Sequence, residues 1–288
     1  MSRIVNNLRT SAKKGDADAQ CKLGIAYYEE KYGLKKNFPV AFKWFLASAK
    51  QGNAEAQCYL GVCYHEGHGV KLSYAKALEW FHKSAAQGND DAQCSIGICY
   101  SNGDGVKQDE SVAVEWYRKS AEHGDADALY YLGEAYSSGE GMVSESFTRL
   151  NYVDEAIKCF RKSAEKNNAA AQFKLGVIYY EGKIVERNPK EAFKWLLKSA
   201  ENGHAEAKYM VGICYRFGQG VKESELLARK WIKRATVDGC FDVQSCLPPC
   251  IVVDIPDASG DYANDTYSIE QQRRRRIKWG QIHRKLMR

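Results

Sequence analysis

The sequence predicts an all-α protein, a right-handed α-solenoid of about six helix-turn-helix repeats. Three observations support this fold class. A glycine recurs at intervals of 36, 37 or 43 residues along the 288-residue chain, a tryptophan recurs almost as regularly, and each unit contains two apolar patterns of helical period. A chain with only 5 prolines and 44 % apolar residues is also typical of a packed helical protein rather than a disordered one. The recurring glycines are Gly24, Gly61, Gly97, Gly133, Gly176 and Gly212.

Each repeat is predicted to be a pair of helices. In the second repeat the first helix falls within residues 54–67 and the second within residues 75–88. Eight residues after each tryptophan position stands a residue that tolerates the left-handed conformation at a helix end, a glycine in five repeats and Asn167 in one. Because one pair cannot bury its apolar face alone, neighbouring pairs must stack around a continuous core. The tryptophan positions are Trp44, Trp80, Trp116, Cys159, Trp195 and Trp231.

The ends of the repeat array and its fourth unit depart from the pattern. Residues 1–16 are expected to form an unpaired capping helix, followed by the solenoid over residues 17–247. The solenoid closes with a seventh first helix that is begun and then stopped, because residues 239–247 copy residues 88–96 until two prolines follow. In repeat 4 the segment 142–154 is expected to project as a loop, whether functional or merely tolerated.

The residues of one repeat resemble a known family. Residues 54–88 follow almost completely the pattern A-x-A-Q-x-x-L-G-x-x-Y-x-x-G-x-G-V and then A-x-x-W-x-x-K-S-A-x-x-G, which is similar to the Sel1-like repeat, a relative of the tetratricopeptide repeats. The resemblance covers about residues 17–239. It implies a concave surface that binds peptides or partner proteins, in a scaffold or adaptor.

The same resemblance suggests where a partner would bind. If the likeness to tetratricopeptide repeats holds position by position, the first helices line the inner face, and its C-terminal half is aromatic. We therefore expect repeats 4 to 6 to hold a peptide or partner segment, because aromatic residues and arginine dominate interface energetics. The alternative is that some of these rings only fill gaps between helices. The residues of this candidate groove are Tyr130, Phe173, Tyr180, Tyr209, Arg216 and Phe217.

The ten cysteines mostly occupy fixed positions of the repeat, which favours buried, free thiols in a reducing compartment over disulfides. A cysteine-rich secreted branch of the family, with hydrolase activity attributed to it, needs a cysteine register that this chain lacks. Cys240, Cys246 and Cys250, together with His283, could hold zinc, although no C-x-x-C pair is present. We expect neither a catalytic group nor a cofactor nor a metal.

The C-terminal region contains an acidic segment followed by a basic one. Residues 248–269 are predicted to be an acidic linker and residues 270–288 a basic tail, with eight basic residues and no acid over residues 271–288. The tail could act as a nuclear import signal, bind phosphates of RNA or DNA, contact an anionic membrane, or remain solvated without a partner. Its central basic residues are Arg273, Arg274, Arg275, Arg276 and Lys278.

The function predicted from these features is a non-enzymatic, monomeric adaptor that binds a protein or peptide partner in its groove. We expect it in the cytoplasm, because no stretch reads as a membrane span or as a signal peptide. The alternatives are a nucleic-acid- or membrane-associated or nuclear protein acting through the basic tail, or a secreted, host-directed effector if the source is an intracellular pathogen.

Overall fold

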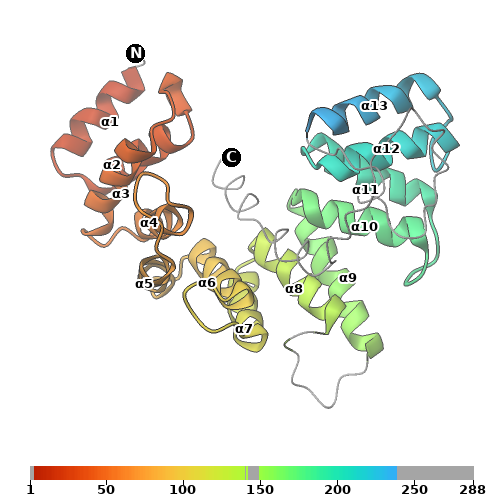
Figure 1. Ribbon diagram of the computed structural model, residues 1–288, viewed down its shortest axis with the longest axis horizontal. Helices are drawn as coiled ribbons and strands as arrows, with labels where there is room; N and C mark the ends of the chain where they lie inside the picture. The colour runs from red at the N-terminus through yellow and green to blue at the C-terminus, as the bar shows by residue number, and fades with distance from the viewer. Residues whose placement is uncertain (1–2, 140, 142–148, 239–288) are drawn as a thin grey trace, which may run out of the picture. The chain divides into compact units, whose positions relative to one another are not determined.

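The computed structural model describes residues 3–139, 141 and 149–238, and in these the protein is entirely helical, with one short 3₁₀ helix (Lys31–Gly33) and no strand (Figure 1). The predicted all-α fold of stacked helix pairs is confirmed. The helices are α1 (Arg3–Lys13), α2 (Ala17–Tyr28), α3 (Phe38–Ala49), α4 (Ala54–Glu66), α5 (Tyr74–Ala85), α6 (Asp90–Asn102), α7 (Glu110–Glu122), α8 (Ala126–Ser138), α9 (Arg149–Glu165), α10 (Ala169–Glu181), α11 (Pro189–Glu201), α12 (Ala205–Phe217) and α13 (Glu225–Val237).

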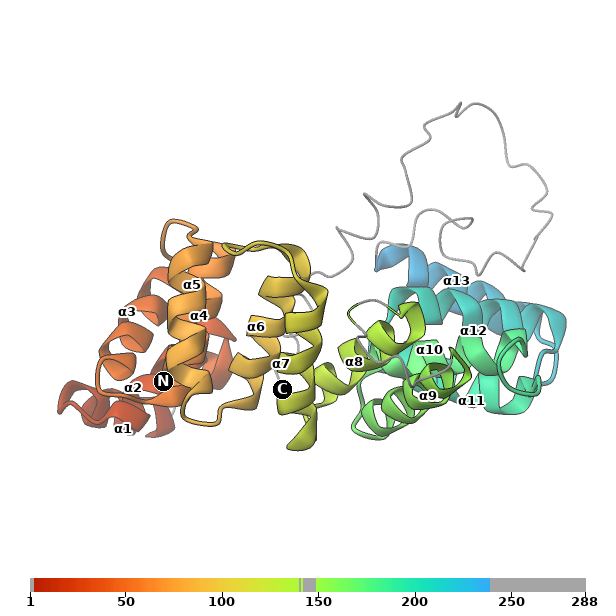
Figure 2. The same ribbon diagram turned by 90° about the horizontal axis from the view of Figure 1, so that it is seen from below.

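The chain divides into two compact units, the first containing α1 to α7 and the second α8 to α13. Within each unit, even-numbered helices are the first helices of the repeats and odd-numbered helices from α3 onward are the second helices. The two helices of a pair pack together, and a second helix also packs on the first helix of the next pair, as α3 does on α4 and α11 on α12 (Figure 2). Helix α1 packs on α2. Neighbouring pairs therefore share their cores, as a solenoid requires.

The recurring glycine allows the two helices of each pair to approach closely. A Cβ atom at this position would lie 2.5 to 2.7 Å from the side chain that follows the tryptophan position in the partner helix, closer than real contacts allow. Any larger residue would push the pair apart, which explains why all six repeats keep glycine here. The facing residues are Gly24 and Phe45, Gly61 and Phe81, Gly97 and Tyr117, Gly133 and Phe160, Gly176 and Leu196, and Gly212 and Ile232.

Side chains define where the helices start and stop. Asn53 caps α4 by accepting a hydrogen bond from the backbone N–H of Ala56 at 2.8 Å, and Asn168 caps α10 in the same way. Asn167 has a φ of 67°, the left-handed conformation that Gly88 adopts at the equivalent position, so the prediction from the glycine-or-asparagine pattern is confirmed.

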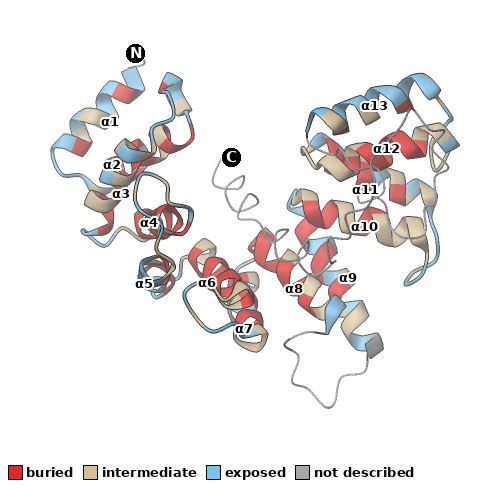
Figure 3. Cartoon of the chain, in the orientation of Figure 1, coloured by how far each residue is buried: buried red, intermediate tan, exposed pale blue. Residues whose placement is uncertain are grey.

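The buried residues gather along the contacts between helices (Figure 3).

Where the loop after a first helix carries two glycines, as in repeats 2, 3 and 6, it joins the repeat to the preceding one. The second glycine of the loop lies against the start of the preceding second helix: a Cβ atom on Gly69 would be 2.5 Å from the carbonyl oxygen of Phe38. Gly220 lies against Pro189 in the second unit in the same way. In these repeats only a residue without a side chain fits this position.

Repeat 4 differs from the prediction. The segment 142–154 was expected to be a loop, but α9 begins at Arg149, so residues 149–154 belong to the helix. The ring of Tyr152 in this extra helical turn stacks on Tyr136 of α8, with centroids 6.2 Å apart. This aromatic contact gives the added turn a partner, which a free loop would lack. The aborted seventh helix over residues 239–247, the acidic linker and the basic tail lie outside the described residues.

Candidate protein-binding surface

The column three residues before the recurring glycine is mostly buried, which corrects the expectation that it lines an open face. Cys21, Cys58 and Cys94 are almost completely inaccessible. The thiol of Cys21 donates to Glu55 Oε2 of the next repeat at 3.6 Å, so the acidic side chain lies over the sulfur. These three cysteines are therefore not part of an open surface.

The aromatic members of this column have three different environments, all in the second unit. Tyr209 is only 3 % exposed and packs with Ile213 and with Ala235 of α13, so it is a core residue and not part of a surface. Tyr130 is half-buried beside Phe160, with ring centroids 6.0 Å apart. The first helices thus turn this column toward neighbouring helices, where the rings fill space.

Phe173 stacks on the imidazole of His204, with ring centroids 4.6 Å apart and planes 18° from parallel. His204 is also the N-terminal cap of α12. The phenylalanine is half-buried. One face of its ring is therefore already occupied by the imidazole.

The remaining three predicted residues lie at the C-terminal ends of α10 and α12. Tyr180 and Arg216 are half-buried, whereas Phe217, the last residue of α12, is 52 % exposed. Ile184 in the loop after α10 is also half exposed, at 49 %. Together with Arg187, these residues are called the aromatic patch below. Exposed aromatic and aliphatic side chains beside arginine are typical of protein-binding surfaces.

Arg187 holds the aromatic patch together across two repeats. Its Nε donates to the carbonyl oxygen of Tyr180 at 3.1 Å, and its guanidinium carbon lies 5.7 Å from the centre of the Tyr180 ring. Its Nη2 donates to Oε1 of Gln219, in the loop after α12, at 2.9 Å. These contacts position the loop after α10 against the loop that follows Phe217.

Sequence reasoning missed Ile184 and Arg187. The available signal was the loop itself: residues 182–184 read Gly-Lys-Ile where repeat 2 has Gly-His-Gly. In repeats 2 and 6 the third residue of this loop is a glycine that contacts the preceding second helix. In repeat 5 the same position carries Ile184, a large and exposed apolar side chain. The residue that departs from the repeat pattern thus lies at the surface, whereas the positions that recur in every repeat lie mostly in the core.

Arg216 is paired within α12 and α13. Its Nε lies 3.5 Å from Glu225 Oε2, and Glu225 Oε1 also accepts a hydrogen bond from Arg229 at 2.8 Å. The hydrogen bond from Arg229 lowers the pKa of Glu225, despite partial loss of solvent, and both arginines add to the effect. An incoming carboxylate would have to compete with Glu225 for Arg216.

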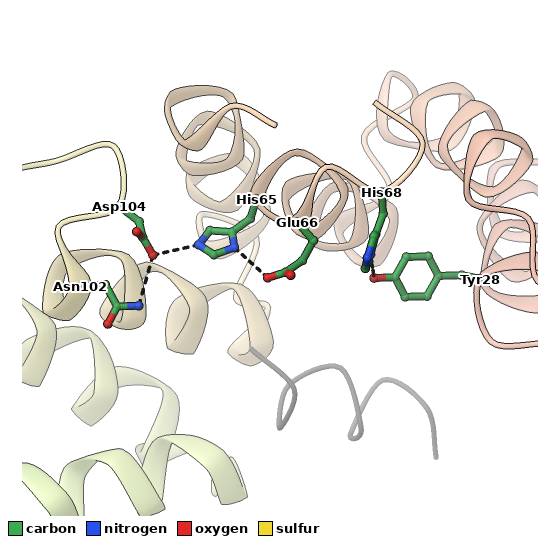
Figure 4. Close-up of polar contacts among 6 residues, drawn as sticks. All are labelled: Tyr28, His65, Glu66, His68, Asn102 and Asp104. Carbon is green, nitrogen blue, oxygen red and sulfur yellow. Dashed lines mark hydrogen bonds and ion pairs between the residues drawn. The ribbon is translucent and has the colours of Figure 1, made fainter. Parts of the chain in front are cut away.

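In the first unit the corresponding helix ends carry a buried polar cluster instead (Figure 4). His65 is buried, and its Nδ1 and Nε2 lie 3.0 Å from Glu66 Oε1 and from Asp104 Oδ2. Tyr28 Oη lies 2.9 Å from His68 Nδ1. The contact of Tyr28 with His68 joins repeat 1 to repeat 2, and the contact of His65 with Asp104 joins repeat 2 to repeat 3. The cluster links repeats 1, 2 and 3.

The environment of His65 acts on its pKa in two directions. Burial lowers the pKa, whereas the hydrogen bonds to Asp104 and Glu66 and the charges of these carboxylates raise it, and the net shift is upward. Nothing in this arrangement supplies a nucleophile, so its chemistry is that of an ion pair between repeats.

The described cysteines are buried and form no disulfide with one another. Burial raises the pKa of Cys214 to about 12, and burial together with Glu55 raises the pKa of Cys21 still further. Thiols of this kind are protonated at neutral pH and react slowly. Within residues 3–139, 141 and 149–238, no group of three His, Cys, Asp or Glu side chains is arranged to hold a metal ion. The candidate zinc ligands lie beyond residue 238.

The fold and the patch together define a class of protein, a repeat solenoid whose helix pairs form a scaffold for surface residues. The chain belongs to the Sel1 repeat family: the model of the Sel1 repeat matches six consecutive segments, residues 17–53, 54–89, 90–125, 126–168, 169–204 and 205–236. The resemblance seen in the sequence is thereby confirmed. No curated protein matches the chain. In the part of the chain that the structure describes, no helix is long and apolar enough to span a membrane.

Several solved structures are similar to this one. A protective antigen of uropathogenic Escherichia coli, described as displaying an SLR fold, is 33 % identical with a TM-score of 0.64, over 82 % of this chain and 49 % of the antigen. The chain thus spans about half the length of that antigen. A Sel1 repeat protein from Oxalobacter formigenes is 29 % identical with a TM-score of 0.65, over 77 % of this chain and 86 % of that protein.

An immunity protein from Pseudomonas aeruginosa also shares the fold, at 19 % identity and a TM-score of 0.54, over 77 % of this chain and 81 % of that one. At this identity the likeness concerns the fold alone. Proteins of the Sel1 repeat family generally act in protein–protein interaction and are generally not catalysts.

Proposed function

We propose that this protein is an adaptor that binds a peptide or a segment of a partner protein on the aromatic patch of its second unit. The observation that supports this most directly is the exposure of Phe217, which is 52 % accessible next to Arg216 at the end of α12. A partner that covers Phe217 and Ile184 would bury apolar surface that is otherwise in contact with water. The neighbouring arginines would favour a partner segment that also carries a carboxylate.

The rigidity of the patch supports the same function. Arg187 bonds both to Tyr180 and to Gln219, so the two loops that frame the patch are held in place before a partner arrives. A preformed surface loses little conformational entropy on binding. The proposed mechanism is therefore burial of a partner's apolar side chains on a surface that needs no rearrangement, without any catalytic step.

Site-specific photo-crosslinking tests this function. A photoreactive phenylalanine analogue in place of Phe217 in the full chain should crosslink to a defined partner, and that partner should be lost when Tyr180→Ala and Arg216→Ala are combined. The matched control is the same analogue at Tyr32, which is 50 % exposed in the first unit. Equal crosslinking of one partner at both positions would contradict binding at the patch.

A second function concerns the basic tail. Its eight basic residues without an acid over residues 271–288 support binding to phosphate-rich partners, nucleic acid above all. Replacing Arg273, Arg274, Arg275, Arg276 and Lys278 with glutamine in the full chain separates the two functions. The adaptor function predicts that crosslinking at residue 217 persists, whereas a function through the tail predicts loss of salt-dependent binding to RNA or DNA.

A further inference from the structure

A hollow lined mostly by basic side chains lies between the start of α12 and the C-terminal half of α13. Helices α11, α12 and α13 pack in succession in this part of the second unit (Figure 1). The hollow has a volume of about 330 Å³. Its lining includes the carboxylate of Asp238, which already pairs with Lys208. The residues that line it are Lys208, Lys230, Lys233, Arg234, Val237 and Asp238.

A second hollow, of about 350 Å³, shares Lys208 and Arg234 with the first and is also lined by Ala200, Glu201 and Trp231. The guanidinium carbon of Arg234 lies 4.9 Å from the centre of the Trp231 ring. The ring therefore supports the arginine that borders both hollows. Because the two hollows share residues, they form one groove, which is called the cationic groove below.

Three of the basic side chains in the cationic groove are available to an anion. Among the residues that the structure describes, no carboxylate forms an ion pair with Lys230, Lys233 or Arg234, and all three are exposed. This differs from the aromatic patch, where Arg216 is paired with Glu225. An incoming anion would not have to displace a described carboxylate from these three residues.

The fourth basic side chain, that of Lys208, departs from the repeat pattern. Its position, four residues before the recurring glycine, holds a buried glutamine in four repeats and a buried leucine in one. In repeat 5, Gln172 at this position accepts a hydrogen bond from Asn202 Nδ2 at 2.8 Å. Repeat 6 has the ion pair of Lys208 and Asp238 at the same spacing of 30 residues. Removing charges from water costs more free energy than burying an amide pair, so packing alone does not explain this replacement.

A phosphate group suits the cationic groove better than a carboxylate. A phosphorylated side chain carries about 1.5 to 2 negative charges and three acceptor oxygens, so several basic side chains can donate to it together. An arginine can donate two parallel hydrogen bonds to phosphate, and lysines bind it as point charges. In the second hollow, Ala200 and Trp231 offer apolar surface to the residues that flank the phosphate.

We propose that the cationic groove binds a phosphorylated serine or threonine in an extended segment of a partner protein. Lys208, Lys230, Lys233 and Arg234 hold the phosphate, and the flanking residues of the segment lie over Ala200 and Trp231. The proposal does not depend on the function proposed for the aromatic patch. Lys208 and Phe217 lie near opposite ends of α12, about 13 Å apart along the helix axis, so the two surfaces are distinct.

Fluorescence anisotropy with the full chain tests the proposal. The probe is a fluorescein-labelled peptide, alanine-alanine-phosphoserine-alanine-alanine, and the comparison peptides carry serine or glutamate in place of phosphoserine. The phosphorylated peptide should bind at least about tenfold more tightly than either comparison peptide. Lys230→Gln combined with Arg234→Gln should weaken its binding by at least about tenfold, because each substitution removes a charge-assisted hydrogen bond.

The matched control is Lys194→Gln combined with Lys198→Gln, at the same two positions of repeat 5. It removes the same charge, Lys198 lies 4.7 Å from the Trp195 ring as Arg234 lies over Trp231, and neither lysine lines the groove. At about 0.15 M salt distant charges are screened, so this control should change the affinity by less than about twofold.

Three results would overturn the proposal. Equal losses in the two double variants would mean that the peptide is attracted only by net charge. Equal binding of the glutamate peptide would mean that the groove does not select phosphate. Failure of the wild type to bind the phosphorylated peptide would exclude an open site, and a carbodiimide crosslink from Lys233 to a carboxylate within residues 240–270 would then identify the chain's own acidic segment as the occupant.

Discussion

Gly105 lies so close to Tyr74 that a Cβ atom on it would be 2.9 Å from the Tyr74 carbonyl carbon. Gly105 belongs to the loop after α6, and Tyr74 is the first residue of α5 in the preceding repeat. The contact thus joins repeats 2 and 3. Because Gly105 also has a φ of 77°, both its backbone conformation and the lack of space require glycine.

Gly105→Ala is expected to destabilise the protein by about 2 to 4 kcal/mol, since it adds a steric clash to the strain of a left-handed alanine. Gly88→Ala is the matched control: Gly88 has a φ of 83°, but no atom lies within 4 Å of its Cβ position. Gly88→Ala should lower the free energy of unfolding by only about 1 kcal/mol. Urea unfolding measures both, and equal losses would show that the contact with Tyr74 is unimportant.

Repeat 1 lacks a preceding pair, and it lacks the paired glycines as well. Glu30 and Tyr32 occupy the two glycine positions with φ values of 60° and 57°, and Tyr32 is half exposed. Glu30→Gly removes the strain of a left-handed residue, offset in part by the greater freedom of glycine in the unfolded chain. We expect a net gain of up to about 1 kcal/mol in thermal or urea unfolding. Destabilisation by this substitution would contradict the prediction.

The pair of His65 and Asp104 should make stability depend on pH. The folded-state pKa of His65 is raised above its usual 6.5, so its stabilising contribution is fully present below pH 6.5 and is lost as the pH rises through the folded pKa. Asp104→Asn should therefore destabilise the protein more at pH 5.5 than at pH 8.5, as measured by urea midpoints. Glu115→Gln, which removes an exposed carboxylate of α7, should show no such difference.

Two glutamines at the same repeat position have different partners. Gln57 donates to the carbonyl oxygen of Ala49 at 3.2 Å and accepts from Gln87 at 2.8 Å, whereas Oε1 of Gln93 is buried without a hydrogen-bond partner. Repeat 4 has Leu129 at this position. A buried acceptor that lacks a partner costs stability, so replacing it with an apolar group is favourable.

Gln93→Leu is therefore expected to be neutral or stabilising, and Gln57→Leu to cost about 1 to 3 kcal/mol because it removes two hydrogen bonds of a buried side chain. Calorimetric melting temperatures of the two variants decide the matter. The prediction fails if both substitutions cost the same.

The buried cysteines should be unreactive in the folded protein. Burial raises the pKa of Cys159 to about 11 and that of Cys214 to about 12, so few thiolates exist at pH 8. Titration with a chromogenic disulfide in native buffer should modify at most the three cysteines beyond residue 238 quickly, and all ten in denaturant. Rapid reaction of more than three thiols in the native state would contradict the burial of these side chains.

Much of the fold could be predicted from the sequence because the same pattern of residue types recurs in six repeats. The glycine that faces Phe81, the helix-ending Asn167 and the caps at the helix starts all depend on local conformation or on the partner helix of the same pair. Such features are short in range, so the residue type alone indicates them. The added turn of α9 was missed because its support, the stacking of Tyr152 on Tyr136, comes from another helix.

The candidate site was predicted only in part. Tyr180, Arg216 and Phe217 lie at helix ends, where the chain turns away and side chains stay accessible. Tyr209 was also named, but it is buried against α13. The exposure of a repeated column depends on what the next repeat places over it, and this differs from unit to unit.

The sequence by itself determined the number of repeats, the helix pairs and the positions where only glycine or asparagine fits, because these follow from backbone conformation and from a fixed period. The tertiary structure alone decided which side chains reach the surface. Glu55 lies over Cys21 and Asp104 binds His65, whereas Phe217 stays exposed among the residues that the structure describes. The physical reason is that burial is a property of contacts between repeats, and those contacts join residues 30 to 40 positions apart.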